Sequence, residues 1–289
     1  MVYVLTNHCA GGNFIENEKR VKETFAGELI EIYHCAEVDD KRGFLKNITE
    51  KDTLVIIGGD GTLNRFVNSI DNVDYPFPIY CYAGGTGNDF LHDTAGDSNS
   101  FIKINEYIKD LPRLYVNGDD YAFVNGVGFG LDGYCCYMGD LSRKKNGKNP
   151  NYLKFALKGL LGGFKPRRAR VTIDGVVREY ENVWFTSVMQ GRFYGGNMMI
   201  VPTQDRLNPE KKISFAVAHT KSRTSILTKL PTVYKGKHVK FKKVFEIIEG
   251  YDIKVEFDSP SPMQIDGEPI ESATFFEAKS YAVISGDNK

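Results

Sequence analysis

The chain has 289 residues, of which 42% are hydrophobic and 26% charged, a composition typical of a globular protein with a substantial core. Its 37 basic and 37 acidic residues cancel, which argues against a general nucleic-acid binder. The five cysteines show no C-x-x-C spacing, so we expect neither a disulfide framework nor a zinc site. No apolar run is long enough to span a membrane and no signal-peptide pattern opens the chain, so we expect a cytoplasmic protein.

The N-terminal part of the chain alternates strand and helix patterns. Strands are expected at residues 2–6, 29–33, 53–57 and 77–82, and helices from Asn13 through Phe25, near 39–49, after Gly61, and at 98–110. Asn13 and Glu16 have the spacing of a capping box, which supports the first of these helices. Alternating strands and helices predict a parallel sheet with helices on its faces, and thus an α/β domain.

The pattern changes near the Asn117-Gly118 turn, which lies between apolar runs at 114–116 and 121–124 and predicts a β-hairpin. Helices are then expected as a pair within 132–161 and singly at 222–230. Strands are expected at 171–173, 176–177, 183–189, 198–201, 213–218, 244–248, 253–257, 274–276 and 281–284. Many short strands predict an antiparallel sandwich. We therefore divide the chain into an α/β domain, residues 1–116, and a β-rich sandwich domain, residues 117–289.

A glycine turn, Gly58-Gly59-Asp60-Gly61-Thr62-Leu63-Asn64, follows the expected strand 53–57 and opens a helix. Free backbone N–H groups and the positive end of a helix dipole meet at such a point, which predicts a phosphate site. A carboxylate is repelled there unless a cation or a proton transfer involves it, so Asp60 is a candidate metal ligand. The alternative is that Asp60 only caps the helix.

A second glycine turn, Ala83-Gly84-Gly85-Thr86-Gly87-Asn88-Asp89-Phe90, follows the next expected strand. The carboxyl ends of neighbouring parallel strands form one edge of a sheet, where open α/β sheets bind ligands. The two turns are therefore expected side by side.

These two turns, with three further segments, resemble the diacylglycerol/sphingosine lipid kinase family. The further segments are Asn7-His8-Cys9-Ala10-Gly11, Asn125 through Asp132, and Gln264-Ile265-Asp266-Gly267-Glu268. The first turn alone is also shared with NAD kinases and, more distantly, with phosphofructokinases. The resemblance implies a nucleotide domain followed by a β-rich domain that takes the lipid, with a cleft between them.

The activity that the resemblance implies is ATP-dependent phosphorylation of a lipid hydroxyl, with diacylglycerol the leading acceptor. Glu268, supported by Asp266, would take the hydroxyl proton, and Asp60 would hold Mg²⁺. Two carboxylates two positions apart point the same way from a strand, which could raise one pKa. The expected nucleotide-binding residues are Asn7, His8, Cys9, Ala10, Gly11, Gly58, Gly59, Asp60, Gly61, Thr62, Leu63, Asn64, Arg65, Gly85, Thr86, Gly87 and Asn88. The implied partner is a lipid at the inner membrane surface, and a homodimer is an allowed assembly.

The chain departs from the family pattern at three places. His8 stands where relatives usually have Pro, and Arg65 where they usually have Glu. Residues 202–213 replace an acidic D-D-G-L-L-D segment that in relatives helps to hold a structural magnesium, so that metal is in doubt here. Arg65 either contacts phosphate or lies on an exposed helix face.

Two other patterns, and the function itself, allow competing interpretations. Gly128 to Gly133 matches G-x-G-x-x-G, but it follows a hairpin, so we interpret it as a coincidental match and not as a dinucleotide site. Lys165, Arg167, Arg168 and Arg170 form a basic run that fits either a membrane surface or a polar strand face. The rival functions are an NAD kinase-like enzyme and a nucleotide-binding protein without turnover.

Overall fold

The computed structural model describes all residues except 8–13, 72, 85–86, 96–99, 147–151 and 287–289. It divides the chain into an N-terminal unit, Met1–Leu111, and a C-terminal unit, Pro112–Lys289. The expected boundary after residue 116 lies five residues too late. It would detach β6 (Arg113–Val116) from β16 (Glu268–Lys279), with which β6 pairs in the C-terminal unit.

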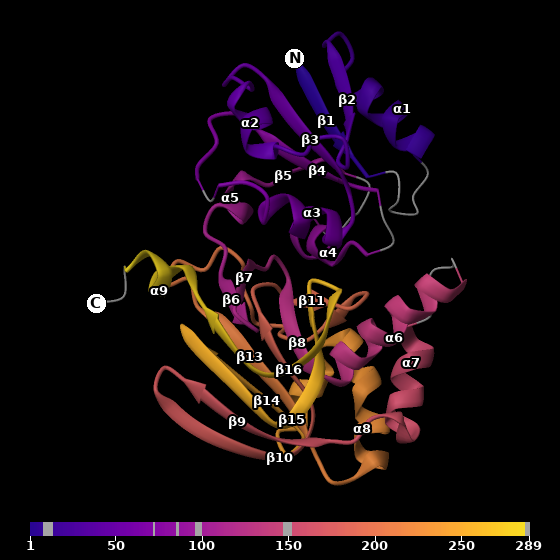
Figure 1. Cartoon of the computed structure of the whole chain (residues 1–289), viewed down its shortest axis with the longest axis vertical. Helices are drawn as coiled ribbons and strands as arrows, with labels where there is room; N and C mark the ends of the chain where they lie inside the picture. Colours follow the sequence, from indigo (N-terminus) through magenta and orange to yellow (C-terminus); the bar gives the residue numbers. More distant parts are fainter. Residues whose placement is uncertain (8–13, 72, 85–86, 96–99, 147–151, 287–289) are drawn as a thin grey trace. The chain divides into compact units, whose positions relative to one another are not determined.

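The N-terminal unit has a five-stranded sheet in the order β2-β1-β3-β4-β5 (Figure 1). Its strands are β1 (Val2–Thr6), β2 (Ile30–His34), β3 (Thr53–Gly58), β4 (Ile79–Ala83) and β5 (Ile102–Lys103). The first four run parallel and β5 is antiparallel to β4. Leu54, Val55, Ile56 and Ile57 are all buried. Such a strand, covered on both faces, is what a short continuous apolar run predicts.

The helices of this unit are α1 (Phe14–Thr24), α2 (Lys41–Lys46), α3 (Asp60–Val67), α4 (Asp89–Ala95) and α5 (Asn105–Ile108). The helix expected over 98–110 is wrong, because β5 and the short α5 occupy that segment. The Asn105 side chain accepts a hydrogen bond from Ile79 N–H (2.8 Å) and donates one to Phe77 O (2.9 Å). This segment is thereby tied to β4. Asn13 of the expected capping box lies outside the described residues.

The C-terminal unit is built on a nine-stranded antiparallel sheet. Its strands are β6, β7 (Asp119–Ala122), β8 (Gly126–Gly130), β9 (Arg167–Ile173), β10 (Val176–Met189), β13 (Ile213–His219), β14 (Phe245–Gly250), β15 (Asp252–Ile265) and β16; β11 (Phe193–Tyr194) and β12 (Met198–Met199) form a separate ribbon. Asn117 and Gly118 have φ values of 53° and 91°, and Asp174 and Gly175 have 48° and 82°. Positive φ at both turn residues is the type I′ geometry, so the hairpin predicted at Asn117-Gly118 is confirmed, and the strands expected at 171–173 and 176–177 form a second hairpin.

Two strands of this sheet, β8 and β9, are collinear and occupy the same position in the strand order. Both pair with β10 on one side and with β15 on the other. Gly130, the last residue of β8, lies opposite Phe185, and Arg167, the first residue of β9, lies opposite Val183. The chain thus leaves the sheet after Gly130 and returns to the same line at Arg167.

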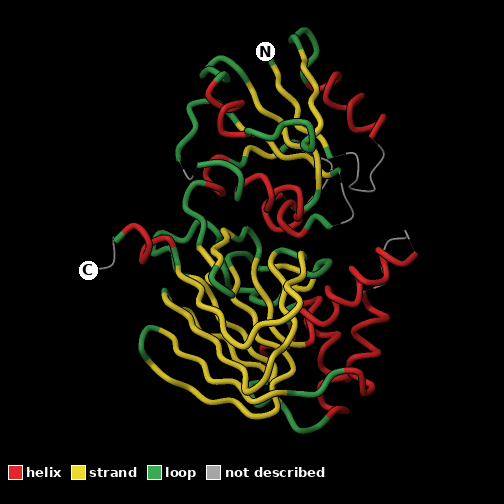
Figure 2. Tube along the Cα trace, viewed as in Figure 1, coloured by secondary structure: helices red, strands yellow, loops and turns green. Residues whose placement is uncertain are grey.

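Helices cover part of this sheet (Figure 2). They are α6 (Leu131–Asn146), α7 (Tyr152–Lys158), the π-helical turn η2 (Gly159–Gly163), α8 (Arg223–Lys229), the 3₁₀ helices η3 (Leu230–Lys235) and η4 (Lys237–Lys240), and α9 (Tyr281–Ser285). One sheet face closes over a single core that includes the stacked rings of Phe129 and Phe257. A second core, with the sole tryptophan Trp184, packs against α6 and α8.

The strand expected at 281–284 is wrong, because this segment forms α9. The amides of Val283 and Ile284 donate to Ser280 O, which begins a helical turn. No helix in the described part of the chain has the length and apolar character needed to cross a membrane. The two-part fold class, an α/β unit followed by a β-rich unit, is confirmed.

Candidate functional site

The first glycine turn joins β3 to α3. Gly59 precedes the helix, and its carbonyl accepts hydrogen bonds from the amides of Thr62 (2.9 Å) and Leu63 (3.1 Å). A Cβ atom on Gly58 would lie 2.4 Å from Thr62 Cβ, so only glycine fits there. Asn7 Nδ2, at the end of β1, donates to Thr62 Oγ1 (3.0 Å). The expected strand–turn–helix geometry is therefore present, with Asn7 beside it.

Asp60 links the two glycine turns. Its amide donates to Gly87 O (2.9 Å), and its carboxylate accepts hydrogen bonds from the amides of Asp89 (2.8 Å) and Phe90 (3.0 Å). Those amides belong to the first turn of α4, so Asp60 caps α4 and not the helix that it begins. The two turns are side by side, as expected from their positions at neighbouring strand ends.

The cap leaves Asp60 with unused acceptor capacity, since each carboxylate oxygen has a second lone pair. Mg²⁺ that accompanies a nucleotide is usually held by one or two carboxylates together with phosphate oxygens and water. Asp60 alone therefore fits the protein part of such a site. No cluster of three His, Cys, Asp or Glu able to hold a metal occurs among the described residues. The metal role of Asp60 stays a prediction.

The other expected nucleotide-binding residues differ in their exposure. Leu63 is buried in the core, so its side chain supports α3 and does not face a ligand. Asn64 is also buried, and its carbonyl and side-chain oxygen accept from Asn68 Nδ2. Arg65 is exposed, with its Nε donating to Gly61 O (3.1 Å). His8, Cys9, Ala10, Gly11, Gly85 and Thr86 lie outside the described residues.

Within the C-terminal unit, Asp266 is a buried anchor in the turn between β15 and β16. Its Oδ2 accepts a hydrogen bond from the Val124 amide (2.7 Å), and its Oδ1 accepts from Asn125 (2.8 Å) and Gly126 (2.9 Å). A carboxylate that accepts three backbone N–H groups is tightly fixed. Asp266 therefore holds the loop that leads into β8, 140 residues earlier in the chain.

The expectation that Asp266 and Glu268 point the same way is wrong. Asp266 lies at a turn position with φ of 47°, not in a strand, so the alternation of strand side chains does not apply to it. Glu268, the first residue of β16, is exposed. Of the two, only Glu268 is exposed, whereas the Asp266 carboxylate is engaged by three backbone amides.

Arg206 holds the same loop through its other polar groups, a carbonyl and a side-chain amide. Its guanidinium is buried, with Nη1 donating to Val124 O (2.5 Å) and Nη2 to Asn125 Oδ1 (2.6 Å). Gln190 donates in turn to Arg206 O (3.2 Å). A buried anion and a buried cation thus fix one short backbone segment.

Asp132 is a buried carboxyl group that the sequence analysis did not place in the site. It lies in the first turn of α6, where its Oδ2 accepts from Tyr194 Oη (3.0 Å). Burial raises the pKa of Asp132 to about 6. The signal in the sequence was its position after a glycine-rich strand and at the start of a helix, the position that Asp60 has in the N-terminal unit.

Glu268 and Asp132 both act on the thiol of Cys136. Burial raises the pKa of Cys136 well above its usual range, and the negative charges of Asp132 and Glu268 raise that pKa further. The two carboxyl groups are thus near one side chain of α6. A buried carboxyl group with a raised pKa is a frequent feature of functional sites.

Close packing and backbone conformation require the glycines around Asp132, and this accounts for the match to a dinucleotide fingerprint. A Cβ on Gly128 would lie 1.5 Å from Asp132 Oδ2, and one on Gly133 would lie 2.2 Å from Pro262 O. Gly130 has φ of 104°. Because β8 is antiparallel to both of its neighbours, no parallel strand–helix–strand unit surrounds the motif. The prediction that the match is coincidental in context agrees with this pairing.

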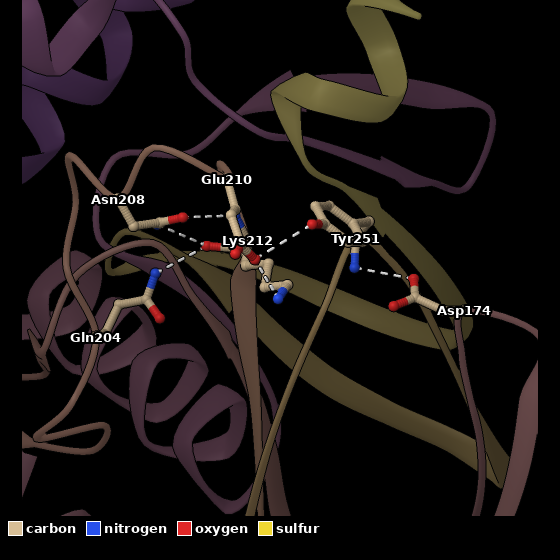
Figure 3. A network of polar contacts seen from close by, with 6 residues as sticks. All are labelled: Asp174, Gln204, Asn208, Glu210, Lys212 and Tyr251. Carbon is tan, nitrogen blue, oxygen red and sulfur yellow. Dashed lines mark hydrogen bonds and ion pairs between the residues drawn. The ribbon is translucent and has the colours of Figure 1, made fainter. Parts of the chain in front are cut away.

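The segment that replaces the family's acidic loop is held by amides and an ion pair (Figure 3). Asn208 and Gln204 donate to Lys212 O (3.1 and 3.0 Å), and the Lys212 amide donates to Asn208 Oδ1 (2.8 Å). Lys212 Nζ pairs with Glu210. The Lys212 ammonium group thus occupies the Glu210 carboxylate, which a bound cation would need as a ligand. The side chains of this segment therefore do not fit a structural magnesium.

The basic run at 165–170 lies largely on a polar strand face, where one of its charges is paired. Arg168 pairs with Glu181 (2.8 Å), and Arg167 donates to Ser259 Oγ (2.5 Å). Ala169 and Val171, between the arginines, are buried. This arrangement favours the strand-face interpretation over the membrane one.

Comparisons with known proteins agree with this architecture. Residues 1–111 match the family model described as "Diacylglycerol kinase catalytic domain", and residues 125–278 match "YegS C-terminal NAD kinase beta sandwich-like domain". The Bacillus subtilis (strain 168) protein named "Putative lipid kinase YtlR" is 27% identical over 253 residues, 78% of this chain and 77% of that protein. The "Diacylglycerol kinase" of Mycobacterium tuberculosis (strain ATCC 25618 / H37Rv) is 25% identical over 201 residues, 67% of this chain and 63% of that protein.

The fold is also that of a solved structure titled "putative diacylglycerol kinase from Bacillus anthracis str. Sterne". The two superpose with a TM-score of 0.66 at 18% identity, covering 97% of this chain and 92% of that one. The fold and the paired glycine turns are those of a two-domain kinase-type enzyme. With both domain models matched in order, the chain belongs to the diacylglycerol kinase-like family of lipid kinases.

Proposed function

We propose that the protein transfers the γ-phosphate of ATP to a lipid hydroxyl, with diacylglycerol as the acceptor and phosphatidic acid as the product. The observation that carries this proposal is the coupling of the two glycine turns through Asp60 at the carboxyl ends of β3 and β4. A glycine turn that opens α3 at the carboxyl edge of the sheet suits a phosphate group, whereas the first amides of α4 are taken by Asp60. The named relatives that are lipid kinases support the acceptor class.

The chemistry divides between the two units. In the N-terminal unit, the glycine turns would bind the phosphates, and Asp60 would hold Mg²⁺, which offsets the charge of the transferred group when bound. In the C-terminal unit, exposed Glu268 would accept the proton of the lipid hydroxyl. The hydroxyl oxygen forms its bond to the γ-phosphorus as the bond to the bridging oxygen breaks, and ADP leaves.

Asp266 supports Glu268 without touching substrate. Its three amide contacts fix the loop 124–126 against the β15–β16 turn, and β16 begins at Glu268. The position of the Glu268 backbone therefore depends on Asp266. Asp266 is a positioning residue in this scheme.

The test is phosphorylation of lipid by labelled ATP. Purified protein is incubated with ATP, Mg²⁺ and diacylglycerol, with sphingosine and NAD as alternative acceptors. We expect labelled phosphatidic acid from the wild type and no product from Glu268→Gln. This variant should still bind ATP, because a general base acts in the transfer step and not in nucleotide binding. Labelled NADP would establish the NAD kinase-like alternative. ATP binding without transfer to any acceptor would establish the nucleotide-binding protein without turnover.

A further inference from the structure

A segment rich in lysine lies between β13 and β14 and has no role in the proposed reaction. We call residues 229–243, which include η3, η4 and the three residues after η4, the lysine platform. It contains Lys229, Lys235, Lys237, Lys240, Lys242 and Lys243. No Asp or Glu occurs from residue 211 through residue 245, so the sequence supplies no local compensating charge.

The charges of this platform face solvent and are not neutralised. The last five of its lysines are all exposed. None of these five pairs with a carboxylate among the residues that the structure describes. Arg168 of the basic run at 165–170 differs in this respect, because it pairs with Glu181.

Exposed apolar side chains lie among these lysines. Tyr234 is 46% exposed, and Val239 and Phe241 are each 37% exposed. The Lys229 ammonium lies 5.5 Å from the centre of the Phe241 ring. Apolar side chains within a cationic surface suit the interface of an anionic bilayer, which accepts both rings and ammonium groups.

The platform is rigid, because its other side is anchored. His238 is buried, and its Nε2 lies 2.9 Å from Ile200 O, while its ring packs edge-on against Phe245 at 5.1 Å. Val233 is fully buried. Gly236 has φ of 61°, and a Cβ there would lie 2.8 Å from Met199 Sδ, so the backbone sits directly on its neighbours. The outward side chains are thus presented from a fixed backbone.

We infer that the lysine platform is a docking surface for an anionic lipid bilayer. The inference rests on the proposed function, since a lipid kinase must reach an acceptor held in a membrane. A nucleic acid suits the platform less well, because exposed Val239 offers nothing to a base or a phosphate, and lysine lacks the planar fork with which arginine binds phosphate. The chain as a whole has no net charge, so attraction to the bilayer depends on this local patch.

The experiment is vesicle co-sedimentation without nucleotide and without diacylglycerol. Wild-type protein should bind vesicles of phosphatidylcholine with phosphatidylglycerol, should bind pure phosphatidylcholine far more weakly, and should dissociate as salt is added. Lys240→Gln/Lys242→Gln/Lys243→Gln should weaken binding about a hundredfold, because each lysine near an anionic surface contributes about fivefold. Phe241→Ser should weaken the part of the binding that persists at high salt.

The matched control is Lys22→Gln/Lys46→Gln/Lys51→Gln, which removes the same charge from exposed lysines of the N-terminal unit and should leave binding unchanged. The inference is overturned if wild type does not bind anionic vesicles, if the control loses as much affinity as the platform variant, or if a DNA duplex binds the platform as tightly as the vesicles. Phosphorylation of a short-chain diacylglycerol in solution is measured in parallel. Vesicle binding without that activity would reject the proposed function and leave the docking surface in place.

Discussion

The contacts of Asp266 predict that Asp266→Asn destabilises the C-terminal unit while preserving its shape. The asparagine amide is the same size as the carboxylate and also tolerates the positive φ of 47° at this position. Its oxygen can face only one side of the group. We expect it to stay with the Asn125 and Gly126 amides, which leaves the Val124 amide facing an NH₂ group.

The size of the effect follows from this loss. A buried hydrogen bond to a charged group is worth about 1.5–3 kcal/mol, and an unsatisfied buried donor costs about 1–3 kcal/mol. The remaining two bonds also weaken, because the acceptor is no longer charged. Relief from burying a charge offsets part of the sum. We therefore expect the free energy of unfolding to fall by about 2–4 kcal/mol.

Trp184 makes this measurement specific to the C-terminal unit. It is the only tryptophan in the chain, and it is fully buried in that unit. Urea unfolding followed by tryptophan fluorescence therefore reports on the unit that contains Asp266. A lower midpoint with an unchanged slope is the expected result.

Glu268→Gln is the matched control, two residues from Asp266 and exposed. It should change stability by no more than about 0.5 kcal/mol, as exposed substitutions usually do, while abolishing turnover. If Asp266→Asn were equally neutral, the three amide contacts would not be what holds the loop 124–126, and its role as a positioning residue would be refuted.

Further predictions concern the pH response, the nucleotide turn and the metal. The folded pKa of Asp132, about 6, lies above the unfolded value of about 3.9, so stability should fall by roughly 2–3 kcal/mol as pH rises from about 4 to about 6. Asp132→Asn should flatten that profile in Trp184 unfolding, and an unchanged profile would contradict the assignment. Arg65→Glu should weaken ATP binding by about 1.5–3 kcal/mol in calorimetry if the guanidinium contacts phosphate; equal affinities would place Arg65 in solvent. Because Lys212 pairs with Glu210, a chelator should leave the Trp184 unfolding midpoint unchanged, and a drop would mean that a metal supports this segment.

Local features of the sequence predicted the elements that local chemistry determines. The apolar run at 53–57 predicted the buried parallel strand β3, and Asn117-Gly118 predicted a hairpin, because the positive φ of a type I′ turn selects such residues. The errors at 98–110 and 281–284 arose where apolar spacing fits more than one structure. At 98–110 the Asn105 side chain decides, through contacts with the backbone at 77–79.

The candidate site could be predicted only as separate pieces. The sequence marks Asp60 and Asp266 as unusual acidic residues in glycine turns, and in the structure both residues do lie beside such turns. Their partners are amides that lie 29 and 30 residues from Asp60 and 140 to 142 residues from Asp266. Neither the spacing of apolar residues nor the preference of a residue for helix or strand can predict a pairing between such distant positions. From the sequence, each carboxylate was therefore predicted to be a catalytic group. In the structure, each one accepts hydrogen bonds from backbone amides.

The collinear strands β8 and β9 make the strand pairing of the sheet independent of the helices that are inserted between them. Their register is set on both sides by β10 and β15, so it does not depend on the length or sequence of residues 131–166 between them. That excursion contains Asp132, Cys136 and α7. The residues that set these strand pairs all lie outside the excursion. Helix positions of this segment outside the second core, where Leu131, Leu160 and Phe164 are buried, can therefore vary without altering the pairing of the sheet.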